Sequence, residues 1–125
     1  MSQSGAQAAA FFREVARHRQ VWYVCDEQGS PVPLTSSGKR AFPYWPSQAR
    51  ADRAASIWGG DLRAVSVSVE TWRDNELPDL TDGDHRVGIN WSEPRLVGWD
   101  FTVTEVLNRL NHALGEGPYA DTAGG

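Results

Sequence analysis

The stretch Val-Ser-Val-Ser-Val, residues 65–69, carries the clearest strand pattern in this sequence. Valine and serine alternate with a period of two, and in an extended chain this spacing puts every valine on one face and every serine on the other. We therefore expect a strand with one buried face. The stretch lies near the middle of a 125-residue chain, so what packs against its apolar face decides the fold.

Helical patterns lie on both sides of this strand. Before it, residues 51–58 place three alanines and a tryptophan on one stripe. Ser47 is a candidate N-cap for that helix, and the pair Gly59-Gly60 favours a left-handed stop. After it, residues 70–76 fit a short helix around Trp72. The strand is thus expected to sit between two helices in the chain.

Pro78 is expected to end the second of these helices, because a proline disfavours the helical conformation of the residue before it. A loop over residues 79–84 then follows. Residues 86–91, which include Gly88, have the composition of the next strand.

Two further helices are expected near the ends of the chain. Residues 6–19 carry apolar side chains at spacings of three and four. Thr102-Val103-Thr104-Glu105 is a capping box, and the apolar stripe that starts there continues to Leu114.

The segment between the first and second helices predicts a meander of three short strands. Residues 21–25 are a continuous β-branched and aromatic run. Residues 32–35 can return antiparallel, although Pro31 and Pro33 restrict that strand to an edge. Residues 40–44 are expected to form the third strand.

This order of elements predicts an α+β fold. We expect a single domain over residues 6–114, with a mostly antiparallel or mixed sheet of about five short strands and helices packed mainly on one face. Residues 1–5 are expected to be frayed, and residues 115–125 to form a disordered tail. The side chains expected in one common core are Trp22, Val67, Ile89 and Leu107.

The composition is that of a globular protein from a reducing compartment. Hydrophobic residues make up 40% of the chain and charged residues 22%, which excludes wholesale disorder. No run approaches the ~18 apolar residues of a membrane span, and the N-terminus lacks the basic and apolar segments of a secretory signal. Cys25 is the only cysteine. We expect a cytoplasmic protein without membrane association.

Charge is unevenly distributed along the chain. Residues 1–60 hold seven basic and four acidic residues, whereas residues 61–125 hold five and twelve. A patch of one sign speeds encounters with a partner of the opposite sign, although a solvated helix face carries the same charges. The leading hypothesis is a non-enzymatic binding module, immunity- or regulator-like, that docks a basic protein. Its candidate partner-binding residues are Glu70, Asp74, Glu76, Asp79, Asp82 and Asp84.

The second hypothesis is an anion or nucleic-acid binder. In residues 42–46, Phe-Pro-Tyr-Trp-Pro, two prolines stiffen three aromatic residues directly before a helix. Such a segment suits recognition, and the amides at a helix N-terminus attract anions. It equally suits core packing, which is the interpretation we favour for Trp45; nucleic acid is less favoured, because the spacing of arginines and aromatics is loose. The candidate ligand-surface residues are Arg40, Tyr44, Trp45, Ser47, Arg50 and Arg53.

The sequence favours a protein that is not an enzyme. The three histidines lack partners at zinc spacings, and Asp26 and Glu27 disfavour the thiolate of the neighbouring Cys25. A hydrolase, the third hypothesis, needs a polar cleft around Asp84 and His85. We therefore predict no catalytic residue, no cofactor and no metal site.

Four segments of the chain together resemble a known family. They are Val21-Trp22, Phe42-Pro43-Tyr44-Trp45-Pro46-Ser47, Leu77-Pro78-Asp79-Leu80 and Val87-Gly88-Ile89-Asn90-Trp91. Over residues 11–112 the chain resembles the bacterial family called domain of unknown function 2750; the tryptophan-proline segment and the Val-Gly-Ile-Asn-Trp strand are the most specific parts. The resemblance implies a small, stand-alone bacterial cytoplasmic protein of unknown oligomeric state, and it implies no activity, cofactor or site residue.

Overall fold

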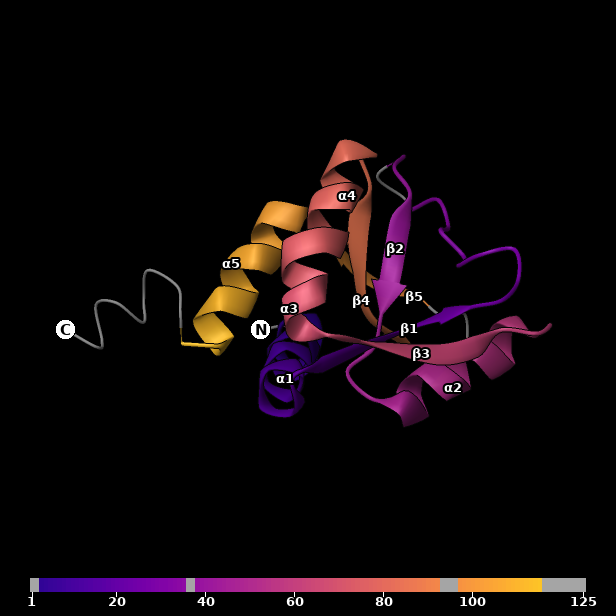
Figure 1. Cartoon of the computed structure of the whole chain (residues 1–125), viewed down its shortest axis with the longest axis horizontal. Helices are drawn as coiled ribbons and strands as arrows, with labels where there is room; N and C mark the ends of the chain where they lie inside the picture. Colours follow the sequence, from indigo (N-terminus) through magenta and orange to yellow (C-terminus); the bar gives the residue numbers. More distant parts are fainter. Residues whose placement is uncertain (1–2, 36–37, 93–96, 116–125) are drawn as a thin grey trace.

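The computed structural model describes residues 3–35, 38–92 and 97–115 and combines helices with two small sheets (Figure 1). These elements confirm the predicted α+β class. In chain order they are α1 (Gln3–His18), β1 (Gln20–Cys25), β2 (Ala41–Tyr44), α2 (Gln48–Trp58), β3 (Arg63–Ser68), α3 (Val69–Thr71), η1 (Trp72–Glu76), α4 (Leu77–Asp82), β4 (Arg86–Ser92), β5 (Val97–Phe101) and α5 (Val103–Ala113).

The strands form two sheets that meet at two tryptophans. β1 pairs antiparallel with β3, and Val21 lies opposite Val67. β2 pairs parallel with β4, which pairs antiparallel with β5. The backbones of Trp22 and Trp45 exchange two hydrogen bonds, of 2.9 and 2.8 Å, that join the sheets. The strands are therefore mixed in direction, as the sequence predicts.

The predicted meander is wrong. Residues 32–35 form no strand and contribute only a bridge between Leu34 and Arg40. Pro31, just before this segment, and Pro33 within it have no N–H to donate, so the segment cannot continue a ladder. β1 and β2, the outer strands of the expected meander, instead pair with strands much further along the chain.

Strand β5 is absent from the sequence-based expectation. Its five residues include a glycine and an aspartate, which lower its strand propensity. It forms because β4 offers it a pairing edge, with Ile89 opposite Trp99 and a register shift between Ile89 and Ser92. The composition of residues 97–101 does not reveal that β4 offers them a pairing edge.

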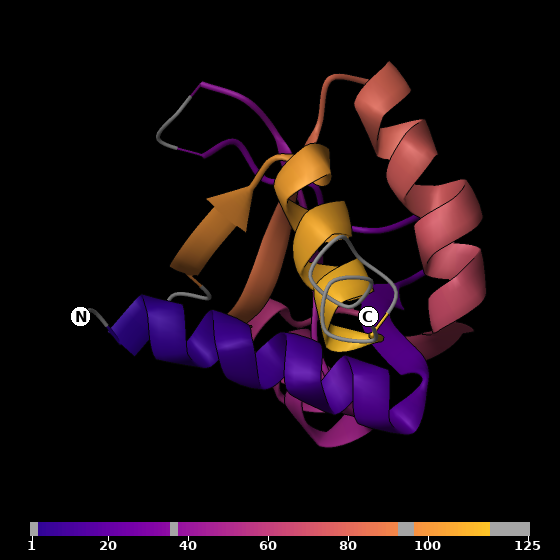
Figure 2. The same cartoon turned by 90° about the vertical axis from the view of Figure 1, so that its left-hand side faces the viewer.

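Residues 69–82 form one continuous helical path through α3, η1 and α4 (Figure 2). The prediction that Pro78 ends the helix, and that residues 79–84 are a loop, is wrong: the path runs on to Asp82, and only Gly83 and Asp84 form a turn. In the π-helical turn η1 the N–H of Leu77 donates to the carbonyl of Trp72, five residues back. This wide turn places Pro78 in the first turn of a new α-helical segment, where its missing N–H costs nothing.

The predicted caps of α2 and α5 are confirmed. The Ser47 hydroxyl accepts a hydrogen bond from the Arg50 N–H, and Gly59 follows α2 with φ of 83°. Thr102 and Glu105 form the reciprocal capping box at the start of α5. The caps are local interactions, which is why the sequence alone reveals them.

The interior is divided into two clusters, so the expectation of one common core is wrong. The main cluster gathers Ile89, with Val67 and Leu107 packed at its margin, between α1, α5 and the sheets. Trp22 is only partly buried and packs against a second cluster around Trp45 and α2. Trp45 is 0% exposed and its indole donates to the carbonyl of Trp91 at 2.7 Å. Core packing is thus confirmed for Trp45.

The described structure begins a few residues before the predicted domain and ends one residue after it. α1 begins at Gln3, within the stretch expected to be frayed, and α5 is followed by Gly115 with φ of 79°. Residues 1–2 and the predicted tail from residue 116 onward lie outside the described residues. No described helix is long and apolar enough to cross a membrane.

Candidate functional site

The six acidic candidates lie along one helical path and the turn after it, but most of them meet a partner within the chain. Glu70 pairs with Arg19, Asp74 with Arg73 at 2.9 Å, and Asp84 with Lys39 at 2.7 Å. Hydrogen bonds lower the pKa of all three carboxyls: the largest cause is backbone donation for Glu70, the Arg73 side chain for Asp74 and the Lys39 side chain for Asp84. Asp79 and Asp82 are exposed.

Glu76 faces inward from the same helical path. Its carboxylate accepts a hydrogen bond of 3.0 Å from the hydroxyl of Tyr44, which is 1% exposed. Burial raises the pKa of Glu76, although the Tyr44 hydrogen bond opposes this, and burial together with Glu76 raises the pKa of Tyr44 far above its ordinary value. Glu76 therefore holds the helix to β2, and one of its carboxylate oxygens is already engaged within the chain.

The structure separates the six candidate residues of the anion surface. Tyr44 and Trp45 are buried, so the expectation that they form a ligand surface is wrong. The chain turns both rings inward because β2 is covered by α2 and by the η1 helix. Arg40 lies at the far end of β2, where its guanidinium donates to the carbonyl of Val32 at 2.9 Å.

The other three candidates of that set line one pocket of about 350 Å³ at the N-terminus of α2. Ser47 caps the helix, while Arg50 and Arg53 follow on the first two turns. The first amides of a helix have no acceptor in a preceding turn, and together with the two guanidinium groups they favour an anion.

The opposite wall of the α2 pocket comes from β4, and sequence reasoning missed it. Asn90 and Trp91 line it, and Ile57 of α2 adds apolar surface. Asn90 has φ of 55°, a left-handed conformation, at the irregularity in the β4–β5 register. Its Oδ1 is buried and meets no donor among the described residues. The only available signal was the residue type, since asparagine tolerates this conformation better than most side chains.

Gly88 leaves room for the Trp91 indole, because it has no side chain at the position where the ring lies. A Cβ atom at position 88 would come within 2.6 Å of the Trp91 indole. Trp91 is 6% exposed and its carbonyl accepts from the Trp45 indole. The ring therefore lies flat on the strand and has a fixed position beside α2.

The cleft that a hydrolase needs exists in outline but its acid–base pair is not formed. A pocket of about 300 Å³ is lined by Asp84, His85 and residues at the start of α5. The Asp84 carboxylate is held by Lys39, and His85 Nδ1 is buried with no partner among the described residues. No described group of histidine, cysteine and carboxylate side chains could hold a metal ion.

A family model described as "Protein of unknown function (DUF2750)" matches residues 8–110. No curated protein and no solved structure matches the chain.

Proposed function

The chain belongs to this DUF2750 family, and on the geometry of its surface we propose that it is a non-enzymatic binding module whose α2 pocket takes a small anionic ligand. The observation that carries the proposal is the convergence of Ser47, Arg50 and Arg53 on one pocket that faces Trp91. These residues are close in sequence, but only the packing of α2 against β4 encloses them.

The two walls of the pocket define the chemistry of the ligand. The α2 wall offers two guanidinium groups and first-turn amides, which bind the oxygens of a phosphate, sulfate or carboxylate. Ile57 and the Trp91 edge offer apolar contact. An anion that carries a flat or apolar group therefore fits better than the inorganic ion alone.

The lining supports binding and gives no support to a reaction. Among the described residues, no histidine, cysteine or carboxylate borders the α2 pocket, so a bound ligand meets no general base there. Ser47 is the sole described hydroxyl of the lining, and it is engaged as the helix cap.

The alternative of a basic protein partner has less support. Most of the acidic candidates are already matched by side chains of the same chain. An ion pair with a partner would have to replace an existing one, which reduces the gain in binding free energy. We also propose a bacterial cytoplasmic location; the resemblance to the family implies it, and the single cysteine is compatible with a reducing compartment.

Thermal shift measurements test the α2 pocket. A ligand that binds only the native state raises the melting temperature by an amount that grows with the ratio of its free concentration to its dissociation constant. We expect phosphate to raise the melting temperature of the wild type, and phenyl phosphate to raise it further at equal ionic strength. The shift should be smaller in Ser47→Ala and Arg50→Ala.

Arg63→Ala is the matched control, because Arg63 is an exposed arginine of β3 outside the pocket. It should keep the wild-type response. Equal shifts in all four proteins would refute the α2 pocket as the anion site.

A further inference from the structure

A second concave surface lies between the two helices that enclose the main core. α1 runs across the end of α5 (Figure 2), and between them lies a groove of about 630 Å³. It shares no residue with the α2 pocket. We call it the α1–α5 groove.

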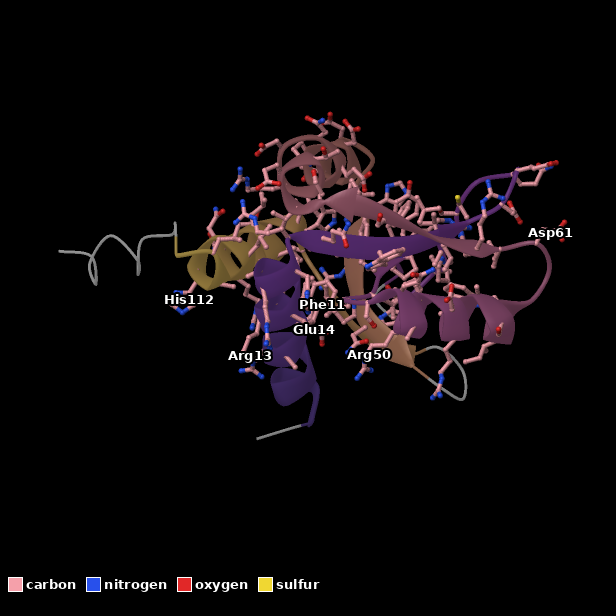
Figure 3. The ribbon with its side chains drawn as sticks, turned by 60° about the horizontal axis from the view of Figure 1, so that its bottom comes forward. Phe11, Arg13, Glu14, Arg50, Asp61 and His112 are labelled. Carbon is pink, nitrogen blue, oxygen red and sulfur yellow. The ribbon has the colours of Figure 1, made fainter. Side chains whose placement is uncertain are left out.

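The rims of the α1–α5 groove are basic on both sides. α1 contributes Arg13 and Arg17, one helical turn apart, and α5 contributes Arg109 and His112. No carboxylate belongs to the described lining. Figure 3 shows Arg13 and His112 on the side of the molecule away from the acidic helix.

One of these cations is held in place by an aromatic ring. The guanidinium carbon of Arg109 lies 5.0 Å from the centroid of the Phe101 ring. A cation–π contact orients the side chain but leaves its N–H donors available to an acceptor. The Phe101 ring therefore fixes the orientation of this guanidinium on the α5 rim, where Glu105, one turn earlier, also interacts with it electrostatically.

The floor of the α1–α5 groove is apolar and shallow. Ala9 and Ala16 of α1 and Ala113 of α5 line it, and Phe12 closes it at the main core. Small side chains allow a close approach of another backbone. Burial of the apolar floor under a partner would stabilise the complex, because apolar surface is removed from water.

We propose that the α1–α5 groove docks an amphipathic helix with acidic flanks from a protein partner. An apolar stripe of such a helix would rest on the alanine floor, and its carboxylates on either side would meet the arginines of the two rims. This is the helix-in-groove mode of recognition, in which charge on the flanks sets orientation. It is independent of the proposed anion ligand.

Charge and composition favour this occupant over a nucleic acid. The chain has a net charge of −4 and carries an acidic helix, and both repel a polyanion that extends beyond the groove more than they repel a short helix confined to it. Bases stack on exposed aromatic rings, whereas Phe12, the aromatic residue of the lining, is 3% exposed.

A synthetic peptide tests the groove on the full chain. The probe is a fluorescent helix of about four turns, with leucine and alanine on one stripe and glutamate on both flanks. We expect saturable binding by anisotropy, weakened by added salt because exposed charges are screened. The double variant Arg13→Glu/Arg17→Glu should weaken binding by roughly tenfold or more.

The matched control is Arg50→Glu/Arg53→Glu, which makes the same change in charge on another exposed helix face. It should bind the peptide within about twofold of the wild type and lose the phosphate response, so the two sites fail separately. Ala9→Gln, which adds an uncharged polar side chain to the floor, should also weaken the binding of the peptide. Circular dichroism melts verify that each variant is folded.

Several results would overturn the proposal. One is equal binding of a scrambled peptide of the same composition, which would mean that charge alone is recognised. A second is equal loss of binding in the Arg50/Arg53 control. A third is tighter binding of a single-stranded RNA, abolished by the Arg13/Arg17 variant. A fourth is self-association of the chain that the same variant removes, which would make a second copy the occupant.

Discussion

The acidic helical path of residues 69–84 and the arginine-rimmed α1–α5 groove carry opposite charges but differ in how far those charges are satisfied. On the acidic side, Glu70 and Asp74 are paired within the chain and Glu76 is hydrogen-bonded to a core tyrosine. In the groove, Arg13 and Arg17 line a surface without a carboxylate in its described part. Both regions stand out by charge, but the described lining of the groove holds no carboxylate, whereas the acidic helix meets arginines of the same chain.

This difference shows why a count of charges along the sequence is a weak guide to a binding surface. A carboxylate that already accepts from an arginine gains little from a second cation, since the first interaction must be exchanged. The acidic helix therefore serves the fold, by salt bridges on its outside and by Trp72, Leu77 and Leu80 on its inside.

The largest effect on stability is expected when the buried anchor of the acidic helix is removed. Trp72 is 0% exposed, and its ring packs against Phe11 and Tyr44 with centroids 6.0 and 5.2 Å away. Trp72→Ala should reduce the free energy of unfolding by about 3–5 kcal/mol, measured by urea denaturation. A loss below about 1 kcal/mol would mean that the helix is held by its surface ion pairs instead.

The next largest effect is expected beside the α2 pocket. Gly88→Ala would place a Cβ atom 2.6 Å from the Trp91 ring. The ring must move, so we expect a loss of about 1–3 kcal/mol and a smaller phosphate shift in the same thermal assay. Ser66→Ala, on an exposed face of β3, should change stability by less than about 0.5 kcal/mol. An undiminished phosphate response in Gly88→Ala would show that Trp91 is no part of the anion site.

Two substitutions of Ser47, with a smaller effect on stability, distinguish its role as a helix cap from a role in anion binding. Ser47→Ala should cost about 1 kcal/mol, because the N–H of Arg50 loses its acceptor. Ser47→Asp should restore the cap but place a carboxylate in the pocket. We therefore expect near-wild-type stability with a lost phosphate response. If Ser47→Asp keeps that response, the ligand does not approach the helix end.

The smallest effect concerns Glu76, and its size depends on pH. Because burial raises the pKa of Glu76 in the folded chain, its contribution to stability is fully present below the ordinary pKa of 4.5 and is lost as pH rises through the folded value. Glu76→Gln keeps an acceptor for Tyr44 without the charge. At pH 7 the variant should be more stable than the wild type by less than about 1 kcal/mol, since the side chain is partly solvated.

The difference in unfolding free energy between Glu76→Gln and the wild type should shrink towards zero near pH 3, where Glu76 is protonated in both states. Asp82→Asn, a neutralisation at an exposed position of the same helix that does not act on Glu76, should show no comparable stabilisation. A Glu76→Gln variant that is less stable than the wild type at pH 7 would contradict the inward, partly buried position of Glu76.

Part of the candidate site was visible in the sequence and part was not. Ser47, Arg50 and Arg53 could be grouped because a cap and two arginines fall within two turns of one helix, a local spacing. Asn90 and Trp91 could not be joined to them, because the wall they form depends on how β4 lies against α2. Arg13 and Arg109 were not grouped at all, since they are far apart in the chain and meet only across two packed helices.

The local features of this protein follow from short stretches of sequence: the helix caps at Ser47 and Thr102, the alternating valines of β3 and the amphipathic stripes of α1, α2 and α5. These depend on neighbours within a few residues, and short-range geometry imposes them in any fold. Only the tertiary structure decided which strands pair, how Pro78 is accommodated after η1, and which charged side chains find a partner. Those outcomes arise from contacts between distant segments, whose free energies depend on the whole arrangement and have no signature in a window of sequence.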